Sequence, residues 1–143
     1  MKKKCKKWKC PKYKGKKCSY NLDRVEISKI LKDNMIHHKG VGLSANQLGI
    51  NERVFVMILH METEEIITCF NPRIIKKYKD CGWFEEGCLS YPDEIINVNR
   101  PNRIVVKYED EDKKNHKIKL DGLAARVFLH EFDHLEGIVF TER

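Results

Sequence analysis

The sequence predicts an α+β fold, in which one helix precedes a series of short strands and a second helix follows them. Three observations lead to this prediction. Apolar residues recur with helical spacing in residues 22–38, short β-branched and aromatic runs fill residues 53–122, and helical spacing returns in residues 123–136. A chain of 143 residues is long enough for one such domain with a buried core.

The N-terminal segment differs in composition from the rest of the chain. Residues 1–18 hold ten lysines and no acid, so residues 19–143 sum to a formal charge of −3 although the whole chain carries +7. A block of like charges disfavours a packed core. We therefore predict a basic arm over residues 1–20 and a folded domain over residues 21–143. The arm is interpreted either as a solvated tail or as a segment that contacts RNA or ribosomes through their phosphates.

The composition of the chain also indicates where in the cell the protein is located. No run of about 18 apolar residues occurs and no apolar stretch follows the basic N-terminus, so the sequence predicts neither a transmembrane helix nor a secretion signal. We expect a cytoplasmic monomer without a membrane partner. The six cysteines then favour metal binding or free thiols over a disulfide framework. Three of them, Cys5, Cys10 and Cys18, lie in the arm and lack the CxxC spacing of a zinc site.

The elements follow in order along the chain. The first helix is predicted over residues 22–38, and Gly40 suits its C-terminal end. Strands are predicted at residues 53–59, 64–70, 72–78, 102–110 and 116–122. The last two strands alternate apolar and polar residues on either side of a polar turn, so we expect them to pair as a hairpin.

The last predicted helix carries the segment His-Glu-Phe-Asp-His, an HExxH pattern. Residues four apart lie on one face of a helix, so His130 and His134 can bind one metal ion. Glu131 is offset around the helix and can reach a water at that ion. The alternative is a surface helix with two solvated histidines, but the apolar neighbours of the motif indicate a largely buried helix.

A catalytic metal usually has three protein ligands, so the HExxH pattern leaves one ligand to be found. Only nine residues follow His134, and the carboxylates among them lie too close in sequence to fold back easily. An upstream ligand is therefore expected, and Cys88 lies after Gly87, which allows close approach of the backbone. The other candidates are Asp133, Glu136, His116 and the remaining cysteines.

A second segment of interest is "KGVGLSANQLGI", residues 39–50, with three glycines and the amide Gln47. Backbone and amide groups of this kind suit hydrogen bonds to a carbonyl oxygen or an oxyanion. The alternative interpretation is a plain loop between the first helix and the first strand.

Three segments in this order, "GVGLSANQ", "EGCLS" and "LHEFDHLEG", resemble the motifs of the peptide deformylase family. That family shows the patterns G-x-G-L-A-A-x-Q, E-G-C-L-S and Q-H-E-x-D-H-L-x-G. Ser44 stands where alanine is common, and Leu129 stands where glutamine is usual. The resemblance is to a short form that lacks the long C-terminal helix of many bacterial members and has the basic arm in place of the family's N-terminal strand.

The resemblance implies antiparallel β-sheets packed around a central HExxH-bearing helix, with an N-terminal helix. It implies a metal-dependent hydrolase that removes the N-formyl group from the initiator formyl-methionine of nascent polypeptides and releases formate. One divalent metal is implied, Fe(II) in vivo with Zn, Ni or Co as substitutes, in a compact bacterial or phage enzyme. The alternatives are a related metallo-amidase or peptidase of different acyl specificity and a non-catalytic relative that binds ribosomes or RNA.

The resemblance also implies roles for residues of the three motifs. The implied metal ligands are Cys88, His130 and His134. Glu131 is the implied general base and acid. The implied hydrogen-bond donors to the formyl oxygen are the Gln47 side chain and the backbone N–H of Leu89.

Substrate contacts are implied as well. Gly42 is expected to offer backbone contacts, and Arg100 matches an arginine near the substrate-binding cleft. Four apolar residues are candidates to line a pocket for the methionine side chain: Leu43, Phe84, Leu123 and Val127. Ordinary packing in the core is the alternative for these four.

Overall fold

The computed structural model describes residues 23–88 and 91–137, apart from the side chains of residues 88 and 91–93. The basic arm and Leu89 therefore lie outside the described residues. In chain order the elements are α2 (Arg24–His37), β1 (Gly42–Ser44), the 3-10 helix η1 (Ala45–Leu48), β2 (Val54–His60), β3 (Glu65–Lys77), β4 (Cys81–Cys88), β5 (Tyr91–Pro101), β6 (Arg103–Glu109), β7 (Asn115–Asp121) and α3 (Gly122–Leu135). Neither helix in the described part is long and apolar enough to cross a membrane.

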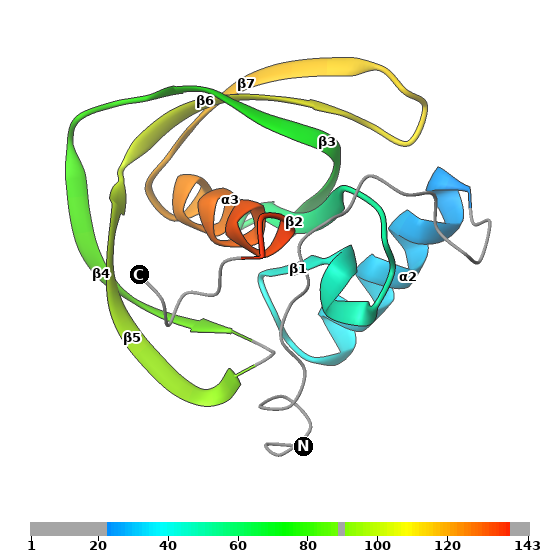
Figure 1. Cartoon of the computed structure of the whole chain (residues 1–143), viewed down its shortest axis with the longest axis horizontal. Helices are drawn as coiled ribbons and strands as arrows, with labels where there is room; N and C mark the ends of the chain where they lie inside the picture. Colours follow the sequence, from blue (N-terminus) through cyan, green and yellow to red (C-terminus); the bar gives the residue numbers. More distant parts are fainter. Residues whose placement is uncertain (1–22, 89–90, 138–143) are drawn as a thin grey trace.

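The strands form two antiparallel sheets. One has five strands in the order β1-β2-β3-β6-β7, and the other is the two-stranded ribbon β4-β5. Both curve around α3, with α2 to one side (Figure 1). The prediction of antiparallel sheets with two helices is confirmed, and so is the hairpin of β6 and β7.

The two strands predicted at residues 64–70 and 72–78 form the single strand β3, so their separation was wrong. The register between β3 and β6 shifts between Phe70 and Arg73, and Asn71 has a φ of 50°. Pro72 cannot donate to the ladder, and Asn tolerates this left-handed conformation. The pair therefore forms a bulge that the strand passes through, where we expected a turn.

The helix α2 is capped at its N-terminus by Asp23, whose side chain accepts a hydrogen bond of 2.8 Å from the backbone N–H of Glu26. It ends where the Gly40 N–H donates to the Met35 carbonyl at 2.9 Å. Its buried side chains pack in a cluster with residues of β1, β2 and β3: Ile27, Leu31, Met35, Leu43, Val54, Val56 and Phe70.

The helix α3 packs against the same sheet through a second cluster. Phe128 meets Phe55 of β2 edge to face, with ring centroids 5.0 Å apart. Because successive strand residues point to opposite faces, Phe55 and Met57 contact this cluster while Val54 and Val56 contact the cluster at α2. The sheet thus lies between the two helices at β2, and the HExxH segment lies on α3, the helix inside the curve (Figure 1).

Candidate metal centre

The helix α3 places His130, Glu131 and His134 together. One ligand atom from each of the three side chains can be chosen so that all lie within 4.8 Å of one another. The Nε2 atoms of His130 and His134 are 3.1 Å apart. All three residues are buried. The predicted convergence of the two histidines on one point is therefore present in the structure.

Glu86 of β4 orients the first of these histidines. Its Oε1 lies 2.9 Å from His130 Nδ1. Burial opposes ionisation of Glu86, but hydrogen bonds from His130 and Arg100 outweigh it and lower the pKa of Glu86 to about 2. Because an ionised carboxylate only accepts, Nδ1 carries the hydrogen and Nε2 presents its lone pair on the side of His134.

Glu86 belongs to a buried ionic network. Its Oε2 accepts 2.5 Å hydrogen bonds from both Arg100 Nε and Arg126 Nη1. Arg100 Nη1 also donates to Asp133 at 2.8 Å, and Arg126 Nη2 donates to the Gly82 carbonyl at 2.8 Å. Burial opposes the charge of Arg100, and its two carboxylate partners still raise its pKa. Two cations thus meet two anions, so the network ties the β4–β5 ribbon to α3 without an unpaired buried charge.

The buried site keeps the imidazole of His134 neutral. Burial is the main cause that lowers the pKa of His134 to about 3. Burial also raises the pKa of Glu131 to about 7, and Glu131 Oε1 has no hydrogen-bond partner among the residues that the structure describes.

These residues fit a divalent metal ion. Neutral imidazole nitrogens are metal ligands. Two nitrogens bound at about 2.1 Å to one tetrahedral ion lie roughly 3.4 Å apart, close to the 3.1 Å between His130 Nε2 and His134 Nε2. The unpartnered carboxylate oxygen of Glu131 lies in the same group, where a proton donor such as a water could reach it.

The segment between β1 and β2 supports the site from the other side. Asn46 Nδ2 donates to the His134 carbonyl and so joins η1 to the end of α3. Gln47 Oε1 accepts hydrogen bonds of 3.0 Å from both the backbone N–H and the hydroxyl of Ser44. The Gln47 oxygen is therefore engaged, and the donor of this amide is its NH₂ group.

The hydroxyl of Ser44 is therefore predicted to help orient Gln47. The variant Ser44→Ala keeps the backbone bond and loses one neutral hydrogen bond, which contributes about 1 kcal/mol. We expect kcat/KM for the reaction proposed below to fall about fivefold, with unchanged metal content. A loss of 100-fold or more would contradict a supporting role.

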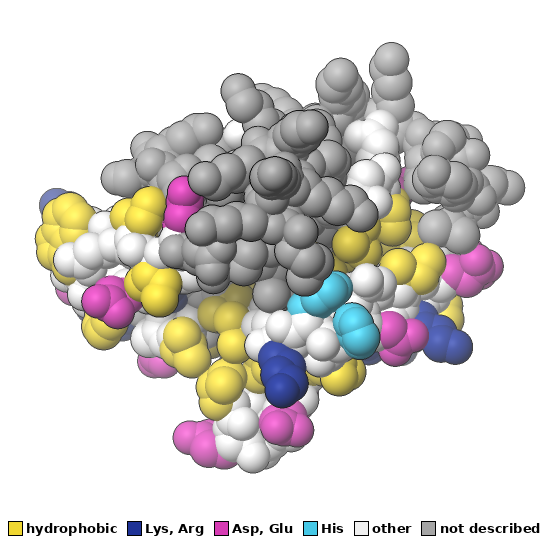
Figure 2. Space-filling view, turned by 90° about the horizontal axis from the view of Figure 1, so that it is seen from below, with side chains coloured by type: hydrophobic (Ala, Val, Ile, Leu, Met, Phe, Trp, Pro, Cys, Tyr) yellow, Lys and Arg dark blue, Asp and Glu magenta, His cyan; other side chains and the backbone are white. Residues whose placement is uncertain are grey.

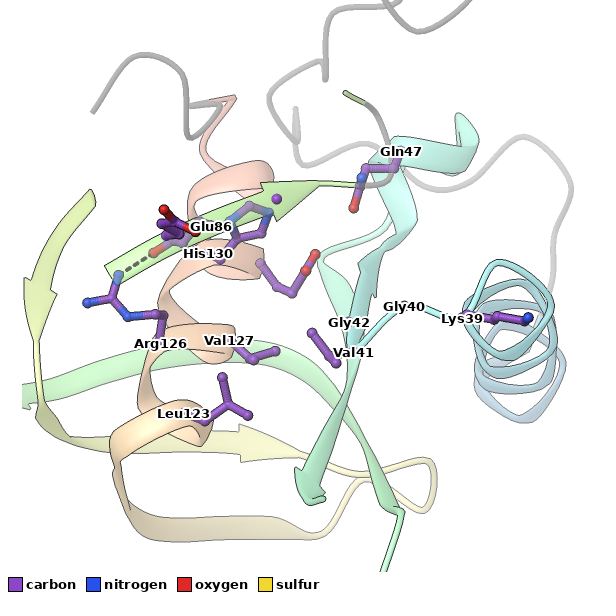
Figure 3. A pocket seen from close by; sticks show the side chains of 13 residues that line it. Lys39, Gly40, Val41, Gly42, Gln47, Glu86, Leu123, Arg126, Val127 and His130 are labelled. Atoms are coloured by element: carbon purple, nitrogen blue, oxygen red, sulfur yellow. Dashed lines mark hydrogen bonds and ion pairs between the residues drawn. The ribbon is translucent and has the colours of Figure 1, made fainter. Parts of the chain in front are cut away.

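A pocket of about 370 Å³ opens beside these residues. Figure 3 shows Val127 and Leu123 of α3 on one side and Gly42 and Val41 on the other. The full lining is Lys39, Gly40, Val41, Gly42, Gln47, Glu85, Glu86, Gly87, Leu123, Arg126, Val127, His130 and Glu131. Two edge strands, β1 and β4, thus flank the histidines and the carboxylate.

A family model described as polypeptide deformylase matches residues 2–143. The chain belongs to this family. The resemblance inferred from the three motifs is therefore confirmed. Peptide deformylase 2 of Prochlorococcus marinus (strain MIT 9313) is 43% identical over 112 residues, which are 77% of this chain and 56% of that protein. Peptide deformylase of Thermotoga maritima is 41% identical over 111 residues, 78% of this chain and 66% of that protein.

Solved structures of the family share the fold. The crystal structure of a probable peptide deformylase from Synechococcus phage S-SSM7 has a TM-score of 0.79 at 40% identity and covers 94% of this chain and 93% of that one. The Thermotoga maritima crystal structure has a TM-score of 0.77 at 38% identity and covers 83% and 81%. The chain spans 56% to 66% of the length of the two curated relatives above.

Three of the six residues expected to contact the substrate line the pocket, and the other three do not. Gly42, Leu123 and Val127 line the pocket. Leu43 is buried in the cluster at α2, which is ordinary core packing. Phe84 is 56% exposed and lies under the Arg126 guanidinium, 4.8 Å from ring centroid to Cζ.

Arg100 also differs from expectation. Among the described residues it does not line the pocket, and its guanidinium is buried between Glu86 and Asp133. Arg100 acts on the site through Glu86, which it binds and which in turn contacts His130. Its geometry does not favour the expected contact with substrate. Sequence reasoning missed Glu86 and Arg126 as site residues. The signal for Glu86 was its place as the first residue of "EGCLS"; Arg126 lies three residues before "LHEFDHLEG" and inside none of the three motifs.

The alternative third ligands are engaged elsewhere. Asp133 binds Arg100, and Glu136 lies 3.8 Å from Arg53. His116 lies on the β6–β7 hairpin, 2.8 Å from Asp110. The side chain of Cys88 lies outside the described part, and its backbone ends β4 two residues after Glu86.

Proposed function

We propose that this chain removes the N-formyl group from formyl-methionyl peptides and releases formate. One observation carries the proposal: in a chain of the deformylase family, His130, Glu131 and His134 form a group that could hold a metal ion, at a pocket that Gln47 also lines. The central, HExxH-bearing position of α3 is part of this proposal, because the helix both fills the core and supplies the reacting groups.

The proposed metal ligands are His130, His134 and Cys88, and the proposed ion is Fe(II). Imidazole and thiolate ligands suit iron and zinc alike, and the resemblance favours iron. When bound, such a cation polarises a carbonyl oxygen and makes a water molecule more acidic.

In the proposed reaction, Glu131 transfers a proton, and Gln47 and Leu89 bind the formyl oxygen. Glu131 accepts a proton from the attacking water, whose oxygen bonds to the formyl carbon. The Gln47 NH₂ group, with the backbone N–H of Leu89 as the second proposed donor, binds the formyl oxygen as negative charge develops on it. Glu131 returns the proton to the nitrogen as the carbon–nitrogen bond breaks, so that formate and a free amine leave.

The pocket is proposed to bind the methionine side chain against Leu123 and Val127. Both residues offer apolar surface within a volume that suits a small ligand. The flanking strands β1 and β4 each have one neighbouring strand among the described elements. An extended peptide backbone between them would add a strand to either edge, which is a recurrent mode of peptide recognition.

The direct test is formate release from a short formyl-methionyl peptide. The protein is purified without oxygen and supplied with Fe(II) or Ni(II), since an Fe(II)–thiolate site oxidises in air. We expect fast, metal-dependent release with the formyl peptide and none with its N-acetylated analogue. Equal turnover of the acetylated peptide would indicate a wider acyl specificity, and no turnover by metal-loaded protein would reject the proposal.

The variant Cys88→Ser tests the third ligand. A hydroxyl is a poor ligand compared with a thiolate, so the metal bound per chain is expected to fall well below that of the parent protein. The comparison is Cys81→Ser, an exposed thiol at the other end of β4, which should leave metal content unchanged. Full occupancy in Cys88→Ser would return the question to the carboxylates near His134.

A further inference from the structure

Six cations and one tyrosine share the outer face of β3, β6 and β7. We call this surface the cationic sheet face and define it by Arg73, Lys76, Tyr78, Arg103, Lys107, Lys117 and Lys119. Residues directly opposite each other on paired strands lie on the same side of a sheet. The register aligns Arg73 with Lys107 and Lys107 with Lys117, so these three cations form a row across three strands.

A second row lies beside the first. Lys76 is opposite Val105, and Val105 is opposite Lys119. Lys76 Nζ, Arg103 Cζ and Lys119 Nζ lie 4.4, 4.5 and 5.3 Å from the centroid of the Tyr78 ring. The two rows therefore form one surface. Within it Arg103 is paired with Asp80 at 3.0 Å and lies opposite Asp121, so the excess positive charge comes mainly from the other five cations.

This surface faces away from the pocket. Ile104 and Val106 are buried in the cluster with α3, so the alternate residues of β6, among them Lys107, point to the other side of the sheet. Figure 1 shows α3 inside the curve of β3, β6 and β7, which leaves their outer side uncovered by any described element. A partner bound there would leave the pocket open.

The charges of the first row are only partly compensated within the described structure, because Glu109 of β6 attracts Arg73 electrostatically but is itself bonded to Arg24 at 2.8 Å. Like charges directly opposite one another destabilise a sheet. Arg73, Lys107 and Lys117 are all exposed, and none has an ion pair within 4 Å among the described residues. Lys107 and Lys117 thus face each other with no ion pair within 4 Å among the described residues, an arrangement that suits contact with a polyanion.

The distribution of charge over the domain supports the same view. Residues 19–143 sum to −3, so a face with six cations stands out against an acidic remainder. The molecular face in Figure 2, viewed from below Figure 1, shows few Lys and Arg side chains among the described residues.

We propose that the cationic sheet face binds the phosphate backbone of RNA. The row of three cations spans two interstrand spacings, about 10 Å, and can neutralise several phosphates of one strand. The choice of RNA rests on the proposed function, because formyl-methionyl chains are synthesised on ribosomes, which contain RNA. An anionic membrane is the alternative outcome of the test. Membrane binding would also bury exposed apolar side chains, and Ile75 of β3 is 47% exposed while Tyr78 and Val105 are half-buried.

The test compares full-length proteins, so that the N-terminal lysines are present in each. The first variant is Arg73→Gln/Lys107→Gln/Lys117→Gln, and the second is Lys76→Gln/Lys119→Gln. Binding of a short single-stranded RNA is measured by fluorescence anisotropy over a range of salt concentrations. Each lost phosphate contact lowers the slope of log Kd against log salt by about 0.7, so we expect decreases of about 2 and about 1.4, with affinity about tenfold weaker for the first variant.

The matched control is Lys29→Gln/Lys113→Gln/Lys114→Gln, which removes the same charge from exposed positions outside the face. We expect its slope to stay at the parent value. An equal decrease in the control would show that net charge alone matters, and an unchanged slope in both face variants would assign RNA binding to the rest of the chain. Either result overturns the proposal.

Two further measurements complete the test. Vesicles that contain phosphatidylserine replace RNA in a parallel titration, and loss of vesicle binding with unchanged RNA binding would overturn the proposal in favour of a membrane. Thermal unfolding of the first variant should occur at or above the parent temperature, because repulsion between cations that face each other is removed. Formate release should be the same in all four proteins, and its absence from all of them would reject the proposed function while the RNA result stands by itself.

Discussion

Replacement of Glu131 by Gln is expected to lower kcat for formate release by about 10²- to 10⁴-fold, the range that a positioned general base and acid contributes. Gln has nearly the same shape, but its amide cannot take a proton from water or return it to the leaving nitrogen. His130 and His134 are untouched, so the metal bound per chain should remain that of the parent protein. The measurement is single-turnover formate release alongside metal analysis of the same samples.

A matched control for this variant is Glu62→Gln, the same chemical change at an exposed position in the turn between β2 and β3. It should leave turnover unchanged. The Glu131→Gln protein should also unfold no earlier than the parent when both are metal-free, since it replaces a buried carboxylate that has no partner for Oε1 among the described residues. Near-normal turnover in Glu131→Gln would remove this residue from the proposed mechanism.

The parts of the site that could be predicted from sequence are those set by local geometry. His130 and His134 converge because residues four apart always share a helix face, whatever surrounds them. The hairpin of β6 and β7 was predictable for a similar reason, since alternation and a polar turn are both local signals. Gln47 was found because an amide between glycines is unusual in an apolar segment.

The parts that could not be predicted depend on contacts between distant segments. Glu86 reaches His130 across 44 positions, and Arg126 reaches Glu86 across 40. Sequence spacing does not reveal either of these two contacts. The residues around Arg100 likewise did not indicate that its guanidinium is buried. The ribbon β4–β5 was missed because glycine and acidic residues mask its strand pattern, although its pairing delivers Glu86 to the site.

Replacement of Gly42 by Ala is expected to impair the same proton transfer without touching a reacting group. A Cβ at this position would lie 2.8 Å from Glu131 Oε2 and 3.0 Å from Glu131 Cγ, closer than such atoms pack. Glu131 is buried and has little room, so its carboxylate must move by several tenths of an ångström or more. Misplacement of a catalytic group by about 1 Å can cost about 100-fold, and we expect kcat/KM to fall by that order.

The informative comparison is Gly87→Ala, on the strand that faces Gly42 across the pocket. There the nearest atom to an added Cβ is the Glu94 carbonyl oxygen at 3.9 Å, an ordinary contact. Both variants add one methyl group to the pocket wall, so a loss caused by crowding of the peptide alone would be similar in the two. A much larger loss in Gly42→Ala, with metal content unchanged, would show that the close approach of β1 fixes the carboxylate of Glu131. Equal losses would assign the role of Gly42 to peptide binding instead.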